Sequence, residues 1–435
     1  MRICLLLFLL ALPVGAEVSP DQVRAAVRQE LAPSLELYRW LHAHPELSGQ
    51  ERNTSARLAD ELRKSELEVI PGVAGTGLLA VLDSGRPGPV VLYRADLDAL
   101  PITEATGLPY SSQNPGVMHA CGHDLHMATA VGVLRVLQRL KSGWSGKVLF
   151  VGQPAEEAGE GAASVLKDPG FQNLLERLGK PKAALALHDM AILPAGQVEV
   201  TSGWTYANVD GIDIVVHGLG GHGAAPDRTV DPVLIGSEIV VALQSIVARR
   251  LPPGERAVVT VGRFQAGTKR NIIPNTAILE LTVRSYGDES RQKILGEIQR
   301  IATHIARAHG APRDPEVVQA EDFTPAVFND PRLAARLRQV IGAAIGQQNV
   351  REGVPLTVGE DFSRYSRELG CPAVLLGLGA ADPKQFAEVG PERIPGLHTD
   401  RWAPAAGPAL ETGITIAALA ILDTLSGEET GIDRP

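Results

Sequence analysis

The first half of the chain alternates between helix-like and strand-like spacings of its apolar residues. Helical spacing over 21–46 predicts a helix there, and a second helix is predicted over about 51–65. Beyond these, short apolar runs occur at 78–82, 90–93, 148–151 and 183–187, and a long helical pattern at 125–141 separates the second run from the third. Short apolar strands that alternate with helices favour an α/β domain with a largely parallel, buried sheet.

From about residue 208 the pattern changes. Polar and apolar residues alternate over 210–217, as in a strand with one buried face, and a glycine-rich turn follows. The elements predicted next are a helix at 231–249, strands at 257–264 and 276–285, a helix at 288–309 and a strand near 315–320. This β-α-β-β-α-β order is the ferredoxin-like arrangement. Because the α/β pattern resumes near 330, we predict one α/β domain of residues 17–206 and 322–435 with an inserted α+β domain of residues 207–321.

The first sixteen residues form a separate segment. Arg2 gives a positive start, residues 3–12 are an unbroken apolar run, and residues 13–16 offer a small-residue cleavage site before Glu17. The run is shorter than the roughly 20 apolar residues of a membrane span, so it is typical of a cleaved export signal. An uncleaved N-terminal anchor is the alternative. We expect the mature chain in a periplasm or outside the cell, with no later segment that spans a membrane.

Charge and cysteine content narrow the function further. The formal net charge is −9 and the basic residues are spread along the chain, which gives nucleic-acid binding little support. Of the three cysteines, Cys4 lies in the export signal, so Cys121 and Cys371 remain. In an oxidising compartment two cysteines suggest a disulfide, which is the alternative to a metal-binding role for Cys121. Cys371, beside the apolar run at 373–378, fits a small buried hydrophobic residue instead.

Polar side chains follow three of the predicted strands. Asp98 comes shortly after the strand at 90–93, Glu156 and Glu157 follow the strand at 148–151, and His188 ends the strand at 183–187. A fourth loop, residues 119–126, contains three histidines, a cysteine and an aspartate and precedes a helix. Ligands of an open α/β sheet gather at the carboxyl ends of its strands, so these loops are expected to converge. A site for metal ions is the simplest interpretation.

Several of these residues also have a structural interpretation. Asp124 is well placed to cap the helix at 125–141, and His126 fits a packed, hydrogen-bonded helix residue. Cys121 and His123 flank Gly122 and can both face one metal cluster from a tight turn. The adjacent carboxylates of Glu156 and Glu157 suit different roles, one as a metal ligand and the other as an acid and base.

Eight short motifs occur in a fixed order along nearly the whole mature chain. They are residues 41–48, 94–101, 119–124, 153–157, 221–222, 271–274, 359–362 and 398–399. Through them the chain resembles the dinuclear metallo-amidohydrolases of the hippurate hydrolase and auxin-conjugate hydrolase group, relatives of aminoacylase and carboxypeptidase G. The resemblance implies a zinc-exopeptidase-like α/β domain whose inserted domain is a lid that also forms a homodimer. It implies two divalent metal ions per subunit, Zn²⁺ first, with Mn²⁺, Co²⁺ or Ni²⁺ as alternatives.

The resemblance also implies a role for each site residue. Cys121 would bridge two ions, the first completed by His123 and His188 and the second by Glu157 and His398. The remaining implied roles are a general base for Glu156, orientation of a ligand for Asp98, polarisation of the scissile carbonyl for His222, and binding of the oxyanion or substrate carboxylate for Asn271 and Arg284. His222 would act in its own subunit or across the dimer; a solvated turn histidine is the alternative.

The implied activity is hydrolysis of the amide bond of an N-acyl amino acid or a similar small amide. A dipeptidase or carboxypeptidase with the same chemistry is one alternative, and a binding protein on a catalytically dead scaffold is another, against which the intact Glu156 argues. The chain departs from the family pattern at several positions, including Asp227, where relatives carry histidine. Trp204, Tyr206 and Trp402 are further departures, and they either shape an acyl pocket or pack in the core.

Overall fold

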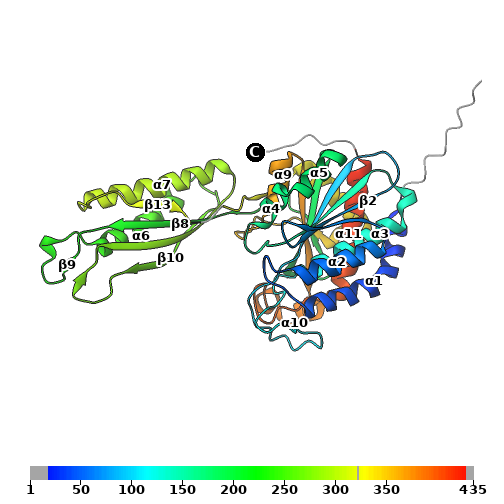
Figure 1. The fold of residues 1–435 in the computed structure, drawn as a ribbon, viewed down its shortest axis with the longest axis horizontal. Coiled ribbons are helices and arrows are strands. Elements are labelled where there is room, and N and C mark those ends of the chain that lie inside the picture. Colours follow the sequence, from blue (N-terminus) through cyan, green and yellow to red (C-terminus); the bar gives the residue numbers. More distant parts are fainter. Residues whose placement is uncertain (1–17, 321–322, 428–435) are drawn as a thin grey trace, which may run out of the picture.

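The computed structural model describes residues 18–320 and 323–427, which form two lobes joined by a narrow connection (Figure 1). The larger lobe contains an eight-stranded sheet covered by helices on both faces, and the smaller lobe contains a four-stranded sheet with two helices. The expected export signal, residues 1–16, lies outside the described residues, and so does the expected domain boundary at 321 and 322.

The large sheet mixes parallel and antiparallel pairs and is parallel at its centre. Its strands, in spatial order, are β1 (Glu68–Val73), β2 (Gly77–Asp83), β4 (Lys147–Gln153), β3 (Val90–Asp96), β5 (Ala183–Pro194), β16 (Ala373–Ala381), β6 (Val198–Glu199) and β15 (Val350–Arg351). Neighbouring strands from β4 to β16 run parallel and so do β6 and β15, whereas β1–β2, β2–β4 and β16–β6 are antiparallel. The prediction of a largely parallel sheet therefore holds for four of the seven strand pairs, including all of the central ones. A connection as short as residues 74–76 allows only an antiparallel hairpin, because a parallel crossover needs a dozen residues or more.

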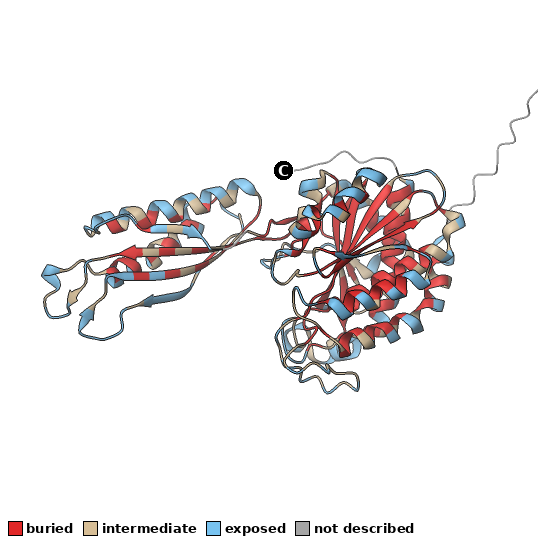
Figure 2. Cartoon of the chain, viewed as in Figure 1, coloured by how far each residue is buried: buried red, intermediate tan, exposed pale blue. Residues whose placement is uncertain are grey.

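Each face of this sheet has its own hydrophobic core. One core packs the sheet against α1 (Pro20–Ala43), α3 (His123–Arg139) and α11 (Ala406–Ser426), with α2 (Arg52–Lys64) and α8 (Pro331–Ile345) beside them. The other packs it against α4 (Gly161–Lys167), α5 (Pro169–Leu178) and α9 (Ser363–Leu369). Both faces of the central strands are buried in Figure 2, which explains their unbroken apolar runs.

Two sequence expectations about helices need correction. α1 ends at Ala43 rather than at residue 46, because Pro45 disfavours helical backbone at the residue before it. Two helices, α6 (Pro232–Arg249) and α11, are long and apolar enough to cross a membrane, although no such segment was expected. In α11, 78% of that apolar window is buried inside the protein, as in the core helix of a globular domain; in α6 the buried share is 33%.

The smaller lobe is an antiparallel sheet with two helices on one face. Its strands lie in the order β13 (Glu316–Gln319), β8 (Asn208–His217), β12 (Thr276–Ser285) and β10 (Val258–Ala266), and its helices are α6 and α7 (Asp288–Ala308). Numbered along the chain this order is 4-1-3-2, that of the ferredoxin-like fold. Its core is separate from the two cores of the large sheet. The predicted fold class, an α/β domain with an inserted ferredoxin-like α+β domain, is confirmed.

The connection between the lobes is held by one buried amide. The Asn208 side chain donates to Ser285 Oγ and to the Gly287 carbonyl, both at 3.1 Å, and accepts from Ala326 N at 2.7 Å. Beside it, Arg367 on α9 forms a two-pronged ion pair with Asp288 at the start of α7, at 3.0 and 3.2 Å. These contacts join the chain segments that enter and leave the smaller lobe.

A buried histidine at the end of α1 gives a pH-dependent stability. The His42 ring contacts Asp124 Oδ2 at 2.7 Å and Glu104 Oε1 at 3.2 Å. Burial disfavours the charged ring, but these two carboxylates outweigh it and raise the pKa of His42 from 6.5 to about 9. The resulting stabilisation, about 3 kcal/mol at about 1.4 kcal/mol per pKa unit, is fully present below pH 6.5 and is lost as the pH rises through about 9.

We therefore expect the free energy of unfolding of the wild type to fall relative to His42→Gln between those two pH values. Glutamine keeps a donor for one carboxylate but does not titrate, so the pH dependence of the difference between the two proteins reports the titration of His42. Urea unfolding of both proteins at a series of pH values measures the difference. A constant difference from pH 6.5 to about 9.5 would contradict a charged His42.

Candidate metal centre

The start of α3, two loops and one strand bring the candidate ligands to one edge of the large sheet. Cys121 and His123 flank the start of α3, Glu157 follows β4, and His398 lies on the loop before α11. His188 lies within β5, which continues to Pro194 instead of ending at residue 187 as predicted. The strand runs on because Gly377 to Gly379 of β16 pair with His188 to Met190.

The donor atoms of these residues lie within a few ångströms of one another. Cys121 Sγ is 3.6 Å from His188 Nε2 and 3.2 Å from His398 Nε2. Glu157 Oε1 is 3.5 Å from His398 Nε2 and 3.9 Å from His123 Nε2. They form two sets, Cys121 with His123 and His188, and Cys121 with Glu157 and His398, and the donor atoms of each set lie within 4.8 Å of one another. The structure thus brings all five sequence-predicted ligands together, with Cys121 shared.

The hydrogen bonds around the cluster leave its donors available for metal ions. His123 Nδ1 faces the Asp98 carbonyl and His188 Nδ1 faces the Asp189 carbonyl, both at 2.8 Å. A carbonyl only accepts, so both Nδ1 atoms carry the proton and both Nε2 atoms present a lone pair to the cluster. His123 Nε2 and Glu157 Oε1 are buried without a hydrogen-bond partner. Buried polar atoms are nearly always paired, so this donor set fits two divalent cations.

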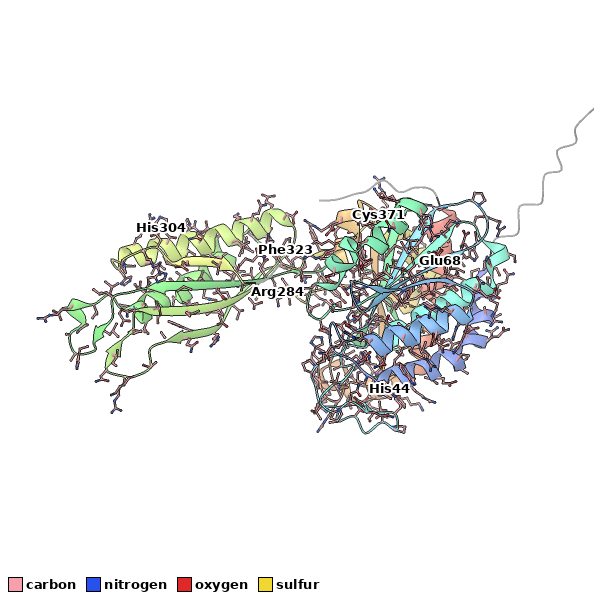
Figure 3. The ribbon with its side chains drawn as sticks, in the orientation of Figure 1. His44, Glu68, Arg284, His304, Phe323 and Cys371 are labelled. Atoms are coloured by element: carbon pink, nitrogen blue, oxygen red, sulfur yellow. The ribbon has the colours of Figure 1, made fainter. Side chains whose placement is uncertain are left out.

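The disulfide hypothesis for Cys121 is wrong. Cys121 is a free, buried cysteine whose sulfur contacts two histidines. Cys371 packs instead in the core around α4, α5 and α9, just before β16 begins, and Figure 3 marks it in the larger lobe. Burial raises the pKa of the Cys121 thiol well above its ordinary value, so a bound cation is needed to hold the thiolate.

Gly122 allows the sharp turn that points Cys121 and His123 at the same space. Its φ is +78°, a backbone conformation that side chains strain, and an added Cβ would lie 2.5 Å from the Asp189 carboxylate. Asp189 is buried and its Oδ1 lies 3.2 Å from His126 Nε2, so the carboxylate has little room to move aside. The glycine is therefore a requirement of the site and not only of the turn.

We expect Gly122→Ala to lower the free energy of unfolding by about 2–4 kcal/mol and to weaken metal binding. Gly116→Ala is the matched control, since Gly116 has a φ of +80° but nothing within 4 Å of its added Cβ. The control should cost only the backbone strain, about 1 kcal/mol. Thermal melts with and without added metal measure both effects, and equal losses in the two variants would contradict the close contact with Asp189.

Asp98 connects the two halves of the cluster. Its Oδ2 accepts from Ser48 Oγ at 2.7 Å and from Glu157 N at 3.0 Å, and its Oδ1 lies 3.3 Å from His123 Nδ1. Burial opposes its charge, but these donors lower the pKa of Asp98 below its ordinary value. Asp98 therefore holds His123 and the Glu157 backbone in one arrangement. Ser48 was missed as a site residue, although it ends the first motif.

Glu156 lies at the same cluster, with Oε2 4.0 Å from His123 Nε2. Burial and the neighbouring charges of Glu360 and Asp361 raise its pKa well above the ordinary value. Both acids pair with the fully buried Arg94, at 2.9 and 3.1 Å. Glu360 also lines the cavity of the metal cluster. The motif at 359–362 contains it, but no role was predicted for it.

The three predicted site residues of the smaller lobe, which we also call the lid, lie in two different places. Arg284 on β12 lines the same cavity as Cys121 and Glu156, at the junction between the lobes (Figure 3). His222 and Asn271 meet each other instead, where β9 (Gly221–His222) pairs with β11 (Ile272–Ile273) as a small antiparallel sheet and Gly223 N donates to the Asn271 carbonyl at 2.9 Å. This small sheet is at the end of the smaller lobe farthest from the larger one (Figure 1). Both side chains are exposed there, away from the metal cluster of their own chain.

Some of the structural roles predicted for residues near the site are confirmed and others are wrong. Asp124 does not cap α3: the helix begins at His123 after Gly122, and the Asp124 side chain binds His42. His126 is packed and hydrogen-bonded as expected, with Nδ1 2.7 Å from Asp96 Oδ1. Of the three aromatic candidates for an acyl pocket, Trp402 is a core residue, Trp204 lines a separate cavity between the lobes, and only Tyr206 lines the cavity of the metal cluster.

Comparison with known proteins places this site in a family. The model of the family described as "Peptidase family M20/M25/M40" matches residues 92–393. The chain is 37% identical over 359 residues to the N-acetylcysteine deacetylase of Bacillus subtilis, covering 81% of this chain and 89% of that protein. It is 35% identical over 353 residues to thermostable carboxypeptidase 1 of Saccharolobus solfataricus, covering 81% and 86%. The crystal structure of the Bacillus subtilis YXEP protein, a dinuclear metal-binding peptidase of the M20 family, matches with a TM-score of 0.76 at 30% identity, over 92% of this chain and all of that one.

The fold and the cluster define a dinuclear metal-dependent hydrolase of amide bonds. The chain belongs to the peptidase family M20/M25/M40. The resemblance stated from the eight motifs is thereby confirmed, and so is the prediction of two divalent metal ions per chain.

Proposed function

We propose that the protein hydrolyses the amide bond of N-acyl amino acids and releases a carboxylic acid and an amino acid. The observation that carries this proposal is one cavity lined by Glu156, Arg284 and four of the five predicted metal ligands, Cys121, Glu157, His188 and His398. Arg284 is the only Lys or Arg among the described residues that line the cavity, which makes it the natural partner of a substrate carboxylate. The similarity to an N-acetylcysteine deacetylase supports the same substrate class.

Zn²⁺ is the cation that we propose for both positions. A thiolate, imidazoles and a carboxylate suit zinc, and Mn²⁺, Co²⁺ and Ni²⁺ are the alternatives for the same donors. Cys121 would be shared, with His123 and His188 on one side and Glu157 and His398 on the other. Bound divalent cations would lower the pKa of water and polarise a substrate carbonyl. Metal analysis of the purified protein before any metal is added tests the identity.

The chain's own residues divide the chemistry among them. Glu156 takes a proton from water and gives it to the departing amine, and its raised pKa suits a group that must hold the proton in between. Asp98 keeps His123 and the Glu157 backbone in place through the bonds described above. Arg284 holds the substrate carboxylate and so fixes which amide bond faces Glu156.

His222 would act in the active site of the other subunit of a homodimer. It is exposed at the far end of the lid, so the carbonyl that it polarises lies in the site of a second copy. A surface for such pairing exists on the same lobe, where α6 exposes four aliphatic side chains, Val233, Leu234, Val241 and Val247. We propose that the partner subunit's His222 and the partner subunit's Asn271 complete each active site.

Mixed dimers test the exchange of His222. Chains with Glu156→Gln and chains with His222→Ala should each be inactive alone. When the two are co-expressed with different tags, each purified mixed dimer contains one of two sites with both residues intact, and its activity should return to at most about half of wild type. No recovery in purified mixed dimers would show that His222 acts within its own chain.

A substrate panel tests the function itself. N-acyl amino acids and dipeptides with the same C-terminal residue are offered to metal-loaded protein, and amine release is measured. We expect the N-acyl amino acids to have the higher kcat/KM. Faster cleavage of the dipeptides would favour the second candidate, an exopeptidase, which the similarity to a carboxypeptidase supports. Tight binding without product would favour a binding protein.

We also propose that the chain is exported and works in a periplasm or outside the cell, on the sequence pattern of residues 1–16. The mature protein would then begin at Glu17 and carry no membrane anchor. N-terminal sequencing of the protein from a periplasmic or culture fraction tests this. Recovery of the uncleaved chain from membranes would favour the anchor.

A further inference from the structure

One side of the metal cavity is apolar and open to solvent. Ile192 and Val358 line the cavity of about 920 Å³ and are 48% and 52% exposed, and Leu356 and Leu397 beside them are half-buried. We call these four residues the apolar wall. Exposed aliphatic residues are ordinary when scattered singly, but four around one catalytic cavity form a patch that favours an apolar ligand.

The exposed members of the apolar wall have no partners in the protein's interior. Ile192 and Val358 belong to none of the three hydrophobic cores. Ile192 is the single exposed residue of β5, which is otherwise buried or half-buried along its whole length, and it follows the ligand His188 by four positions. Val358 precedes Glu360 by two positions. Both are therefore fixed close to the chemistry by the elements that also carry site residues.

The loop that carries Leu356 and Val358 is held by the lid. Three lid side chains donate to three successive carbonyls: Arg256 Nη1 to Pro355 at 2.9 Å, Tyr286 Oη to Leu356 at 2.7 Å, and Arg284 Nε to Thr357 at 3.1 Å. On the other side, the backbone bonds Leu356 N to Thr205 O at 2.8 Å and Ala207 N to Val358 O at 2.9 Å. With its backbone paired in this way, the loop does not need to reorganise to bind a ligand, which favours affinity.

The charges of the cavity restrict where an apolar group can lie. Five acidic residues line the cavity, namely Glu156, Glu157, Glu160, Asp189 and Glu360, and Arg284 supplies the only guanidinium among the described residues that line it. A substrate whose carboxylate binds Arg284 and whose amide faces Glu156 has one part left to place. The apolar wall offers that part a surface without charge that is also open to solvent.

We propose that the apolar wall selects substrates with a bulky apolar group, an aromatic ring or an alkyl chain of several carbons, in preference to small acetylated amino acids. This rests on the proposed function. The apolar group belongs either to the acyl side or to the amino-acid side chain, and Ile192 and Val358 are the residues that determine the specificity.

Two substrate series show whether the apolar group that the wall binds is on the acyl side or on the amino-acid side. In one, glycine carries acetyl, butanoyl, hexanoyl or benzoyl groups; in the other, acetyl is joined to glycine, alanine, leucine or phenylalanine. Full burial of one methylene corresponds to roughly a fourfold gain in binding. We expect kcat/KM to rise at least about tenfold along one series. A flat or falling profile in both series would overturn the inference while leaving the proposed function intact, whereas no cleavage of any N-acyl amino acid would overturn both.

Two variants of the apolar wall and one matched control test whether the wall causes this substrate preference. Val358→Ser and Ile192→Ser should each reduce the ratio of kcat/KM between the bulkiest and smallest substrates at least about threefold. Val354→Ser is the control, because Val354 is 59% exposed on the same loop but is not among the described residues that line the cavity. All three side chains are exposed, so thermal melts should show intact folding. An equal ratio in Val358→Ser and Val354→Ser would overturn the role of the apolar wall.

Discussion

Replacing Glu156 with glutamine is expected to lower kcat by about 10²–10⁴ while two metal ions per chain are retained. Glutamine has the same shape but neither accepts a proton from water nor delivers one to the leaving amine. The metal donors are unchanged, because the two donor sets around Cys121 do not need Glu156. Steady-state kinetics on the best N-acyl amino acid, combined with metal analysis of the same sample, measures both quantities.

Glu160→Gln is the matched control for this substitution. Glu160 lines the same cavity four positions later and is exposed, and its side chain does not cap the helix that follows it. The control removes the same charge from the cavity without touching the cluster, so kcat should stay near the wild-type value. A near-normal kcat for Glu156→Gln would exclude Glu156 as the general base, and equal losses in both variants would point to the electrostatics of the cavity instead.

Cys121→Ala is expected to reduce the bound metal below two ions per chain. It should also lower the affinity for divalent metal ions at least about a hundredfold. The shared sulfur lies 3.2 Å from His398 Nε2 and 3.6 Å from His188 Nε2, so its loss removes a donor from both sets at once. Even residues that only support a metal ligand change affinity about 10- to 100-fold, and a shared ligand should exceed that range. Metal analysis after dialysis against a weak chelator measures the stoichiometry.

Cys371→Ala is the control for the loss of a buried cysteine. Cys371 packs in the core around α4, α5 and α9 and belongs to neither donor set, so this variant should lose some stability but bind two ions like the wild type. Two ions retained in Cys121→Ala would contradict the shared thiolate.

Most of the site was predictable because its residues follow strands that the apolar pattern reveals. Glu156, Glu157 and His188 are placed by β4 and β5, and the parallel pairing of β3 with both strands brings their ends together. His123 is placed by the helix that follows the turn at Gly122. In each case a local pattern determined the element, and the topology of the sheet determined the meeting point.

The parts that were missed depend on contacts between distant segments. Glu360 reaches the cavity through an ion pair with Arg94, 266 positions away, and no local pattern shows such a pairing. Asp124 was expected to cap a helix, but a buried histidine from α1 attracts its side chain instead. The distance of His222 from the metal cluster follows from the lid's length and orientation, which the sequence does not encode in any motif.

The place where the lid leaves the larger lobe has a consequence for folding. Val209 and Thr324 form a two-way backbone bridge at 2.9 and 3.1 Å, so the two ends of the insertion lie side by side. The large sheet can therefore close while residues between these points are still a disordered loop, and doubling the length of such a loop costs only about 0.6 kcal/mol. We expect the sheet of the larger lobe to gain protection from hydrogen exchange independently of the lid, and lids of quite different length to be tolerated on the same body.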